Sequence, residues 1–165
     1  MAVDIEVIDR CQHNILENMD DLNERINEYN FYHLDSSFLI DLLRETARER
    51  PGPAFDLIES LDANEVLGVS VHVVCELRAG AELSRRALQE HAALDELLAG
   101  VLVVYPDDRF APAYARLLAG TARGGRPVGA LDLLIATAAT LDDAPLVTRN
   151  VKDFSRVPGL RVLKY

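Results

Sequence analysis

Three carboxylates in this 165-residue chain stand in apolar surroundings, where acids are unusual. Asp35 lies in "YHLDSSFLIDLL" (32–43), Glu76 follows an apolar run in "VSVHVVCEL" (69–77), and Asp132 lies in "GALDLLIATAAT" (129–140). A buried lone carboxylate is costly unless it is paired, protonated or bound to a metal. Oxygen ligands without histidine or cysteine suit Mg²⁺ or Mn²⁺. Such an ion activates water and stabilises the oxygens of a phosphodiester, so the three acids predict metal-assisted phosphodiester hydrolysis.

A fourth polar group lies in "LVTRNVKDF" (146–154), directly after an apolar run. Thr148, Asn150 and Asp153 all offer oxygen atoms to the same site. The alternative is a simple turn, in which Asn150 and Asp153 make local bonds to the backbone.

Each of the three apolar-framed acids also has an ordinary structural explanation. Asp35 or Ser36 is a suitable residue to cap a helix. Asp132 falls in a first helical turn, near the positive end of the helix dipole. Glu76, whose neighbours predict an inward position, is suited to an ion pair with Arg78 or a distant arginine. All three together favour the metal site over three separate structural roles.

Five short β-rich segments alternate with helical patterns along the chain, which predicts an open, mostly parallel sheet covered on both faces. The strands are expected at 31–35, 67–71, 101–104, 145–148 and 160–163, and the helices at 37–48, 54–61, 72–80, 84–99, 109–121 and 130–141. In such sheets ligands bind outside the carboxyl ends of the strands, and Asp35 stands at one such end.

Residues 4–30 differ in character from the rest of the chain. Apolar side chains recur there in steps of three, four and seven, which predicts one amphipathic helix with acidic flanks. Its stripe consists of Ile8, Cys11, Ile15, Met19, Leu22, Ile26 and Tyr29.

The chain is acidic, with a net charge of −10 at pH 7, which argues against broad nonspecific binding to nucleic acid. No apolar run reaches the ~18 residues that cross a membrane, and the beginning of the sequence does not resemble a secretory signal. Cys11 and Cys75 lie far apart without metal-type spacing. We therefore expect a cytoplasmic protein without structural zinc.

Four segments in order, "LDSSFLIDLL", "SVHVVCELRAGAE", "GALDLLIATAA" and "LVTRNVKDFSRVPGLRV", resemble the PIN-domain ribonucleases, in particular the toxins of VapBC-type toxin–antitoxin pairs. The resemblance covers residues 31–165 and leaves 1–30 as an acidic helical extension. It implies a PIN-like three-layer α/β/α sandwich with a short parallel sheet. The implied activity is that of a Mg²⁺- or Mn²⁺-dependent endoribonuclease.

The same resemblance implies roles for individual residues. Asp35, Glu76 and Asp132 match the metal-binding catalytic acids of the family. The family's fourth acid falls by spacing on the neutral Asn150, so Asp153, one helical turn later, is expected to complete the catalytic set. The polar residues expected to line the site are Ser37, Thr148 and Asn150.

An RNA substrate needs cations for its phosphates. The candidates are Arg78, Arg123, Arg126, Arg149 and Lys152. A cognate antitoxin is expected to lay a helix in a groove of the domain, and the toxin is expected to be a homodimer. Three interpretations of residues 1–30 stay open: an arm for dimerisation or partner binding, an antitoxin-derived inhibitory segment, and an extension that is disordered when alone.

Two other functions compete with the nuclease. A PIN-like module that binds RNA or a partner with little cleavage is favoured by the neutral Asn150. A phosphatase of the aspartyl-phosphate type needs a second acid two residues after Asp35, and Ser37 occupies that position.

Overall fold

The computed structural model describes residues 30–62, 65–125 and 127–165. The helix predicted for residues 4–30 therefore lies almost entirely outside the described residues, as does Arg126. None of the described helices is long and apolar enough to cross a membrane.

A five-stranded parallel sheet forms the centre of the molecule, with the strand order β3-β2-β1-β4-β5. The strands are β1 (Asn30–Leu34), β2 (Glu65–Ser70), β3 (Leu102–Val104), β4 (Leu146–Val147) and β5 (Val162–Leu163). Each falls within a residue or two of its predicted segment, which confirms the parallel sheet.

Helices connect the strands, as parallel neighbours require. They are α3 (Ser36–Ala47), α4 (Pro53–Ser60), α5 (Val71–Glu82), α6 (Ala87–Ala99), α7 (Phe110–Arg123), α8 (Ala130–Leu141) and α9 (Val151–Phe154). The first six confirm the predicted helices, although α6 starts three residues later than expected, because Ser84 Oγ accepts a bond from the Arg86 amide in a preceding turn. The one-turn helix α9 is too short to show a hydrophobic period and was not predicted.

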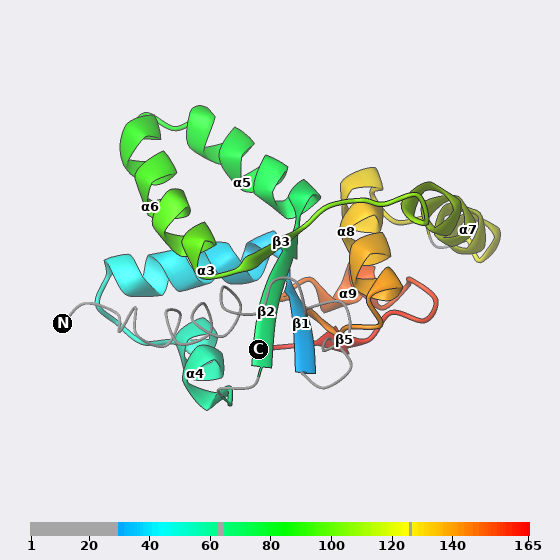
Figure 1. The fold of residues 1–165 in the computed structure, drawn as a ribbon, viewed down its shortest axis with the longest axis horizontal. Coiled ribbons are helices and arrows are strands. Elements are labelled where there is room, and N and C mark those ends of the chain that lie inside the picture. The colour runs from blue at the N-terminus through cyan, green and yellow to red at the C-terminus, as the bar shows by residue number, and fades with distance from the viewer. Residues whose placement is uncertain (1–29, 63–64, 126) are drawn as a thin grey trace.

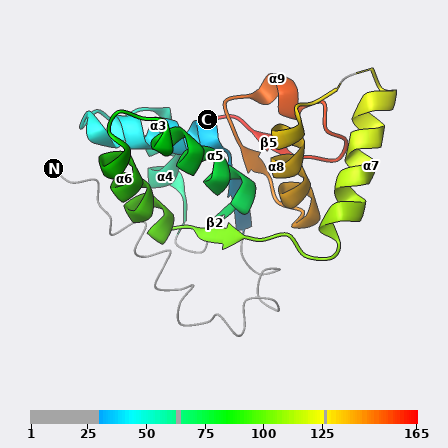
Figure 2. The same cartoon turned by 90° about the horizontal axis from the view of Figure 1, so that it is seen from above.

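The helices flank the sheet as the predicted sandwich requires. In both views α3, α4 and α6 lie on one side of the strands, and α7 and α8 lie on the other (Figures 1 and 2). On the second side α8 packs on β2 and α7 packs on α8 (Figure 2), so both faces of the parallel sheet are covered.

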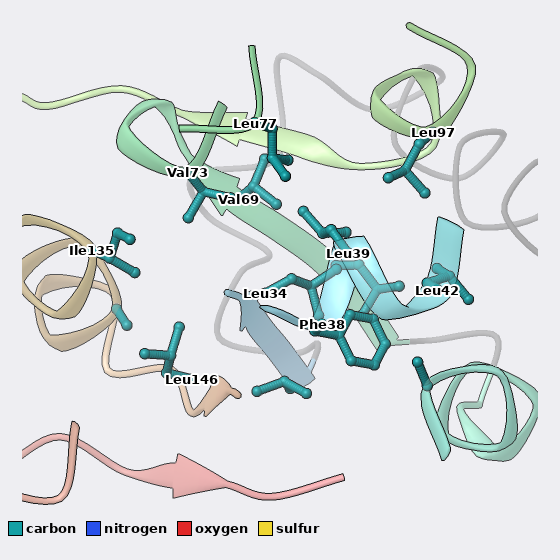
Figure 3. Close-up of a cluster of buried hydrophobic side chains, with 14 of the residues drawn as sticks. Leu34, Phe38, Leu39, Leu42, Val69, Val73, Leu77, Leu97, Ile135 and Leu146 are labelled. Atoms are coloured by element: carbon teal, nitrogen blue, oxygen red, sulfur yellow. The ribbon is translucent and has the colours of Figure 1, made fainter. Parts of the chain in front are cut away.

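The core lies where α3 and α5 pack on the strands (Figure 3). Phe38 and Leu39 of α3 and Val69 of β2 are completely buried. Burying each such side chain contributes about 1.5–3 kcal/mol. The core fixes where α3 begins, and the beginning of α3 sets the position of Asp35.

The strand order brings distant segments of the chain together at the carboxyl ends of the strands. β1 lies between β2 and β4, so Asp35 after β1 and Thr148 after β4 become neighbours although 113 residues separate them. The Asp35 amide also donates to the Val147 carbonyl at 3.0 Å. After β1 the chain turns to one face of the sheet, and after β4 it turns to the other face. Parallel sheets bind ligands in the crevice that opens between two such neighbouring strands, at their carboxyl ends.

Candidate active site

Asp35 is held at the N-cap position of α3, but its side chain makes no capping bond. Its carboxylate is almost fully buried, and both of its side-chain donors converge on one oxygen. Oδ2 accepts bonds from Ser37 Oγ at 2.7 Å and from Thr148 Oγ1 at 2.6 Å. No described residue donates to Oδ1. The alternative that Asp35 merely caps its helix is therefore wrong for the side chain, and one oxygen is left for a ligand.

The two hydroxyls that hold Asp35 are themselves fixed by the backbone of the segment after β4. Thr148 is completely buried, and its Oγ1 accepts a bond from the Asn150 amide at 2.9 Å. Ser37 Oγ accepts a bond from the Arg149 amide at 3.2 Å. Each hydroxyl thus receives a backbone hydrogen and gives its own hydrogen to Asp35, which orients both donors.

Asp132 lies in the first turn of α8 and is half-buried, as the sequence predicts. Burial raises the pKa of its carboxyl, and the negative charges of Asp35, Asp153 and Glu76 raise the pKa further. These are the same four acids that the sequence singled out, now close enough for their charges to repel one another. A cation between them relieves that repulsion.

Glu76 is exposed on α5, so the expectation that it points inward is wrong. Val73, Leu77 and Ala81 are the buried residues of that helix, and Glu76 lies beside this buried face, where it is open to solvent. The suggested ion pair with Arg78 does not form, because Arg78 bonds to Asp95 Oδ1 at 2.5 Å across the α5–α6 pair. Among the described residues no cation pairs with Glu76, which leaves its carboxylate free for a ligand.

Asp153 and Asn150 come together on α9 and its cap. Asn150 makes no side-chain capping bond, and the half-buried Asp153 pairs with Arg156 at 3.3 Å. Arg156 also donates to the Pro127 carbonyl at 3.4 Å and so ties α9 to the loop before Asp132. The alternative turn, in which the side chains of Asn150 and Asp153 bond to the nearby backbone, is not observed in the described residues.

The cations predicted to bind RNA phosphate differ in availability. Arg123 and Lys152 are exposed and form no ion pair among the described residues. Arg149 is exposed but pairs with Asp41 of α3. Arg78 is committed to Asp95 and the His91 carbonyl, which makes it the weakest candidate of the described residues.

The donor set fits a hard divalent cation that keeps much of its water. The four acids supply only oxygen, and within the described ranges no three acidic, histidine or cysteine residues are grouped to hold a metal ion directly. Mg²⁺ is commonly held through one or two carboxylates while it retains several waters. The free Oδ1 of Asp35 and the carboxylates of Asp132 and Glu76 would hold the ion together with its retained waters, and Asp153 would complete the acidic set.

Three residues at this site were missed by sequence analysis: Asp41, Arg156 and Tyr165. Asp41 Oδ2 accepts bonds from Arg149 and from the Tyr165 hydroxyl, the latter at 2.9 Å. Asp41 was detectable, because "FLIDLL" places an acid in an apolar helix by the same rule that revealed Asp35. No local pattern connects Tyr165 to the site, since its contact spans 124 residues.

Comparison with known proteins identifies the fold around these acids. Residues 32–160 match the PIN domain. The chain belongs to the PIN domain family. Ribonuclease VapC1 of Haemophilus influenzae strain R2866 is 32% identical over 130 residues, 79% of this chain and 94% of that protein. Within the PIN domain family the chain therefore belongs with the VapC ribonucleases.

Two solved structures agree with this assignment. The structure of VapBC2 from Rickettsia felis bound to a promoter DNA fragment contains a chain with a TM-score of 0.75 and 27% identity, covering 82% of this chain and 98% of that one. A chain in VapBC-1 from nontypeable Haemophilus influenzae has a TM-score of 0.72 and 31% identity, covering 81% and 97%. The predicted family, α/β/α fold and ribonuclease class are confirmed.

Proposed function

We propose that this PIN-domain ribonuclease is a toxin that hydrolyses RNA phosphodiester bonds at a Mg²⁺ or Mn²⁺ site formed by Asp35, Asp132 and Glu76, with Asp153 completing the catalytic set. The main support is the electrostatic grouping of the four acids, because the other three raise the pKa of Asp132. The finding that Asp35 keeps one oxygen free of protein donors supports the same conclusion.

In this proposal each residue has a distinct part. A bound divalent ion supplies activation of water and stabilisation of charge on the phosphate oxygens. Ser37 and Thr148 hold Oδ2 of Asp35, so that Oδ1 is presented in one orientation. Asn150 lines the site and offers an amide to water or substrate at the position where the family resemblance implies an acid.

RNA would approach across the exposed cations near the acids. Arg123 at the end of α7, Arg149 in the loop after β4 and Lys152 on α9 are all exposed, so they are suited to phosphates of one strand. Their contact is with the backbone, which carries no base information and leaves the identity of the target RNA to other features.

The antitoxin partner has a suitable surface on the α3, α5 and α6 side. A groove of about 860 Å³ lies between these helices. Leu43, Leu77 and Leu94 contribute apolar lining, and charge of both signs comes from Arg44, Arg86, Glu76 and Glu90. Apolar grooves of this kind receive an amphipathic helix. The names of the similar structures, VapBC2 and VapBC-1, support a cognate antitoxin as the occupant.

The remaining features of the proposal concern the whole chain. Residues 31–165 form the nuclease unit, and residues 1–30 form an acidic extension that assists assembly or inhibits the site. The active protein is a homodimer in the cytoplasm, where its RNA and its antitoxin are found.

The deciding experiment is cleavage of a mixed RNA pool with Mn²⁺, with Mg²⁺ and with chelator. Cleavage that requires the ion and is lost in Asp132→Ala is the expected result. A protein that binds RNA without cleaving it, and binds equally well after Asp35→Ala, is instead a binding module. The neutral Asn150 and the pairing of Asp153 with Arg156 are the observations that favour this second function.

A further inference from the structure

Asp41 gathers two donors beside the acidic site, although it is not itself one of the grouped acids. It lies one and a half turns after Asp35 on α3, and its side chain is only 15% exposed. Arg149 and Tyr165 both donate to its Oδ2. We call Asp41, Arg149 and Tyr165 the Asp41 cluster.

Packing holds the cluster in place as well as hydrogen bonding. The Tyr165 ring meets the ring of Phe38 edge to face, with centroids 4.9 Å apart. Phe38 is completely buried in the core, so this contact anchors Tyr165 to α3. Burial and the adjacent Asp41 raise the pKa of Tyr165 to about 12, so its hydroxyl stays a donor at neutral pH.

The cluster is linked to Asp35 through the backbone of Arg149. While the Arg149 guanidinium bonds to Asp41, the amide of the same residue donates to Ser37 Oγ at 3.2 Å, and Ser37 donates to Asp35 Oδ2 at 2.7 Å. The adjoining residue Thr148 makes the second bond to that oxygen. Asp41 therefore clamps the segment that carries Thr148 and the Arg149 amide against α3, which carries Ser37 and follows Asp35.

From this geometry we infer that Asp41 and Tyr165 are positioning residues for the nuclease centre: they fix the Thr148–Asn150 segment on α3, and through Ser37 and Thr148 they set the orientation of the metal-binding oxygen of Asp35. The inference rests on the proposed metal-dependent cleavage. In this inference the Asp41 cluster orders the site before a metal ion binds.

A positioning role predicts a change in the Mn²⁺ requirement and in kcat, without a rise in the KM for RNA. Outer residues that orient metal ligands typically change metal affinity or activity by about 10–100-fold. Asp41→Ala should therefore raise the Mn²⁺ concentration for half-maximal cleavage by about 10-fold and lower kcat. The KM for RNA should not rise, because Arg149 keeps its positive charge and loses the carboxylate that competes with phosphate.

The test compares variants of the full chain by Mn²⁺ titration, kcat and KM, with Mn²⁺ binding measured separately without RNA. Glu59→Ala, which removes one exposed carboxylate from α4, is the matched control and should behave as the parent protein. Asp41→Asn, which keeps an acceptor oxygen of the same shape, should recover most of the Mn²⁺ affinity.

Tyr165→Phe provides a milder second variant if Asp41→Ala folds poorly. It removes one hydroxyl and keeps the ring on Phe38, so it should move the Mn²⁺ requirement in the same direction by a smaller factor. Because both residues act through one oxygen, the double variant should be no worse than Asp41→Ala alone.

Unchanged Mn²⁺ affinity and kcat in well-folded Asp41→Ala would overturn the inference, as would additive effects of the two substitutions. Those results leave parent cleavage intact and so differ from a failure of the proposed function. A parent protein that neither binds Mn²⁺ nor cleaves RNA would remove both proposals together.

Discussion

The pKa of the Asp132 carboxyl reflects both its burial and the charges of the neighbouring acids, and the same carboxylate is a proposed metal ligand. Its pKa is raised in the folded protein, so the unfolded chain loses this proton at a lower pH than the folded protein does. The contribution of this group to the free energy of unfolding is therefore greatest below the ordinary carboxyl pKa. This contribution falls as the pH rises from the carboxyl pKa of the unfolded chain to the raised pKa of the folded protein, and it stays low at higher pH.

Asp132→Asn should accordingly raise the melting temperature of the metal-free protein at neutral pH, because it removes a carboxylate that burial and three like charges oppose. It should also lower cleavage by about 100-fold or more, since Lewis-acid stabilisation is worth several kcal/mol. Thermal melts with and without Mn²⁺ check both points. The parent should gain stability from the ion, and the variant should gain less. A variant that cleaves at the parent rate would contradict the metal site.

Thr148 offers a second test at the scale of one residue. Thr148→Val replaces the buried hydroxyl with a methyl group of similar size and removes one of the two donors to Asp35 Oδ2. It also leaves the Asn150 amide without its acceptor, so about 1–3 kcal/mol of stability should be lost. The Mn²⁺ requirement for cleavage should rise by about 10-fold. Thr140→Val, in which the lost hydroxyl bonds only to a carbonyl of its own helix, is the control.

At the scale of elements, α5 must start in register for Glu76 to face the other acids. Ser70 caps this helix, because its buried hydroxyl accepts a bond from the Val73 amide at 3.4 Å. Ser70→Ala should cost about 1 kcal/mol, or roughly 2–4 °C in the melting temperature of a domain of this size. Chemical denaturation measures this cost, with the exposed Ser60→Ala as control. Retained Mn²⁺-dependent cleavage is expected, since the core residues Val73 and Leu77 also hold α5.

At the scale of the whole molecule, the groove between α3, α5 and α6 can be filled without disturbing the core. Gly80 of α5 lines the groove, and a Cβ atom added there meets no atom within 4 Å. Gly80→Leu should therefore weaken binding of the cognate antitoxin at least about 10-fold, the effect of losing ~1.4 kcal/mol.

Gly80→Ala is the matched control for that substitution. It removes the helix penalty of glycine, about 0.8–1.0 kcal/mol, and adds only one methyl group. Binding close to that of the parent is expected for this control, measured by calorimetry. Equal antitoxin affinity for both variants would place the antitoxin on another surface.

The acidic extension is tested by comparing cleavage of mixed RNA by the full chain and by residues 31–165, each with Mn²⁺ and with chelator. An extension that covers the site predicts faster cleavage by the shorter protein. Equal metal-dependent cleavage by both proteins would assign residues 1–30 to assembly instead. Melting curves of the two proteins provide the control that the shorter one is folded.

Local patterns in the sequence determined much of this protein. Alternating apolar segments predicted the five strands and six of the seven described helices, because period and length are local properties of the chain. The acids Asp35, Glu76 and Asp132 were found because each breaks the local rule that keeps charge out of apolar runs. Thr148, Asn150 and Asp153 were found as oxygen-bearing residues that follow an apolar run, and the family resemblance then implied the roles of Asn150 and Asp153.

The tertiary structure alone decided how those residues are held. The inward position expected for Glu76 was wrong. The residues around Glu76 are apolar on more than one side of α5, so the sequence could not tell which side the fold buries. The Asp35 carboxylate does not cap its helix. It accepts bonds from Ser37 and from Thr148, which lies 113 residues away in the sequence. Such contacts depend on the strand order, which places β4 beside β1, and no local spacing encodes that order. For the same reason Tyr165 entered the site only through the fold.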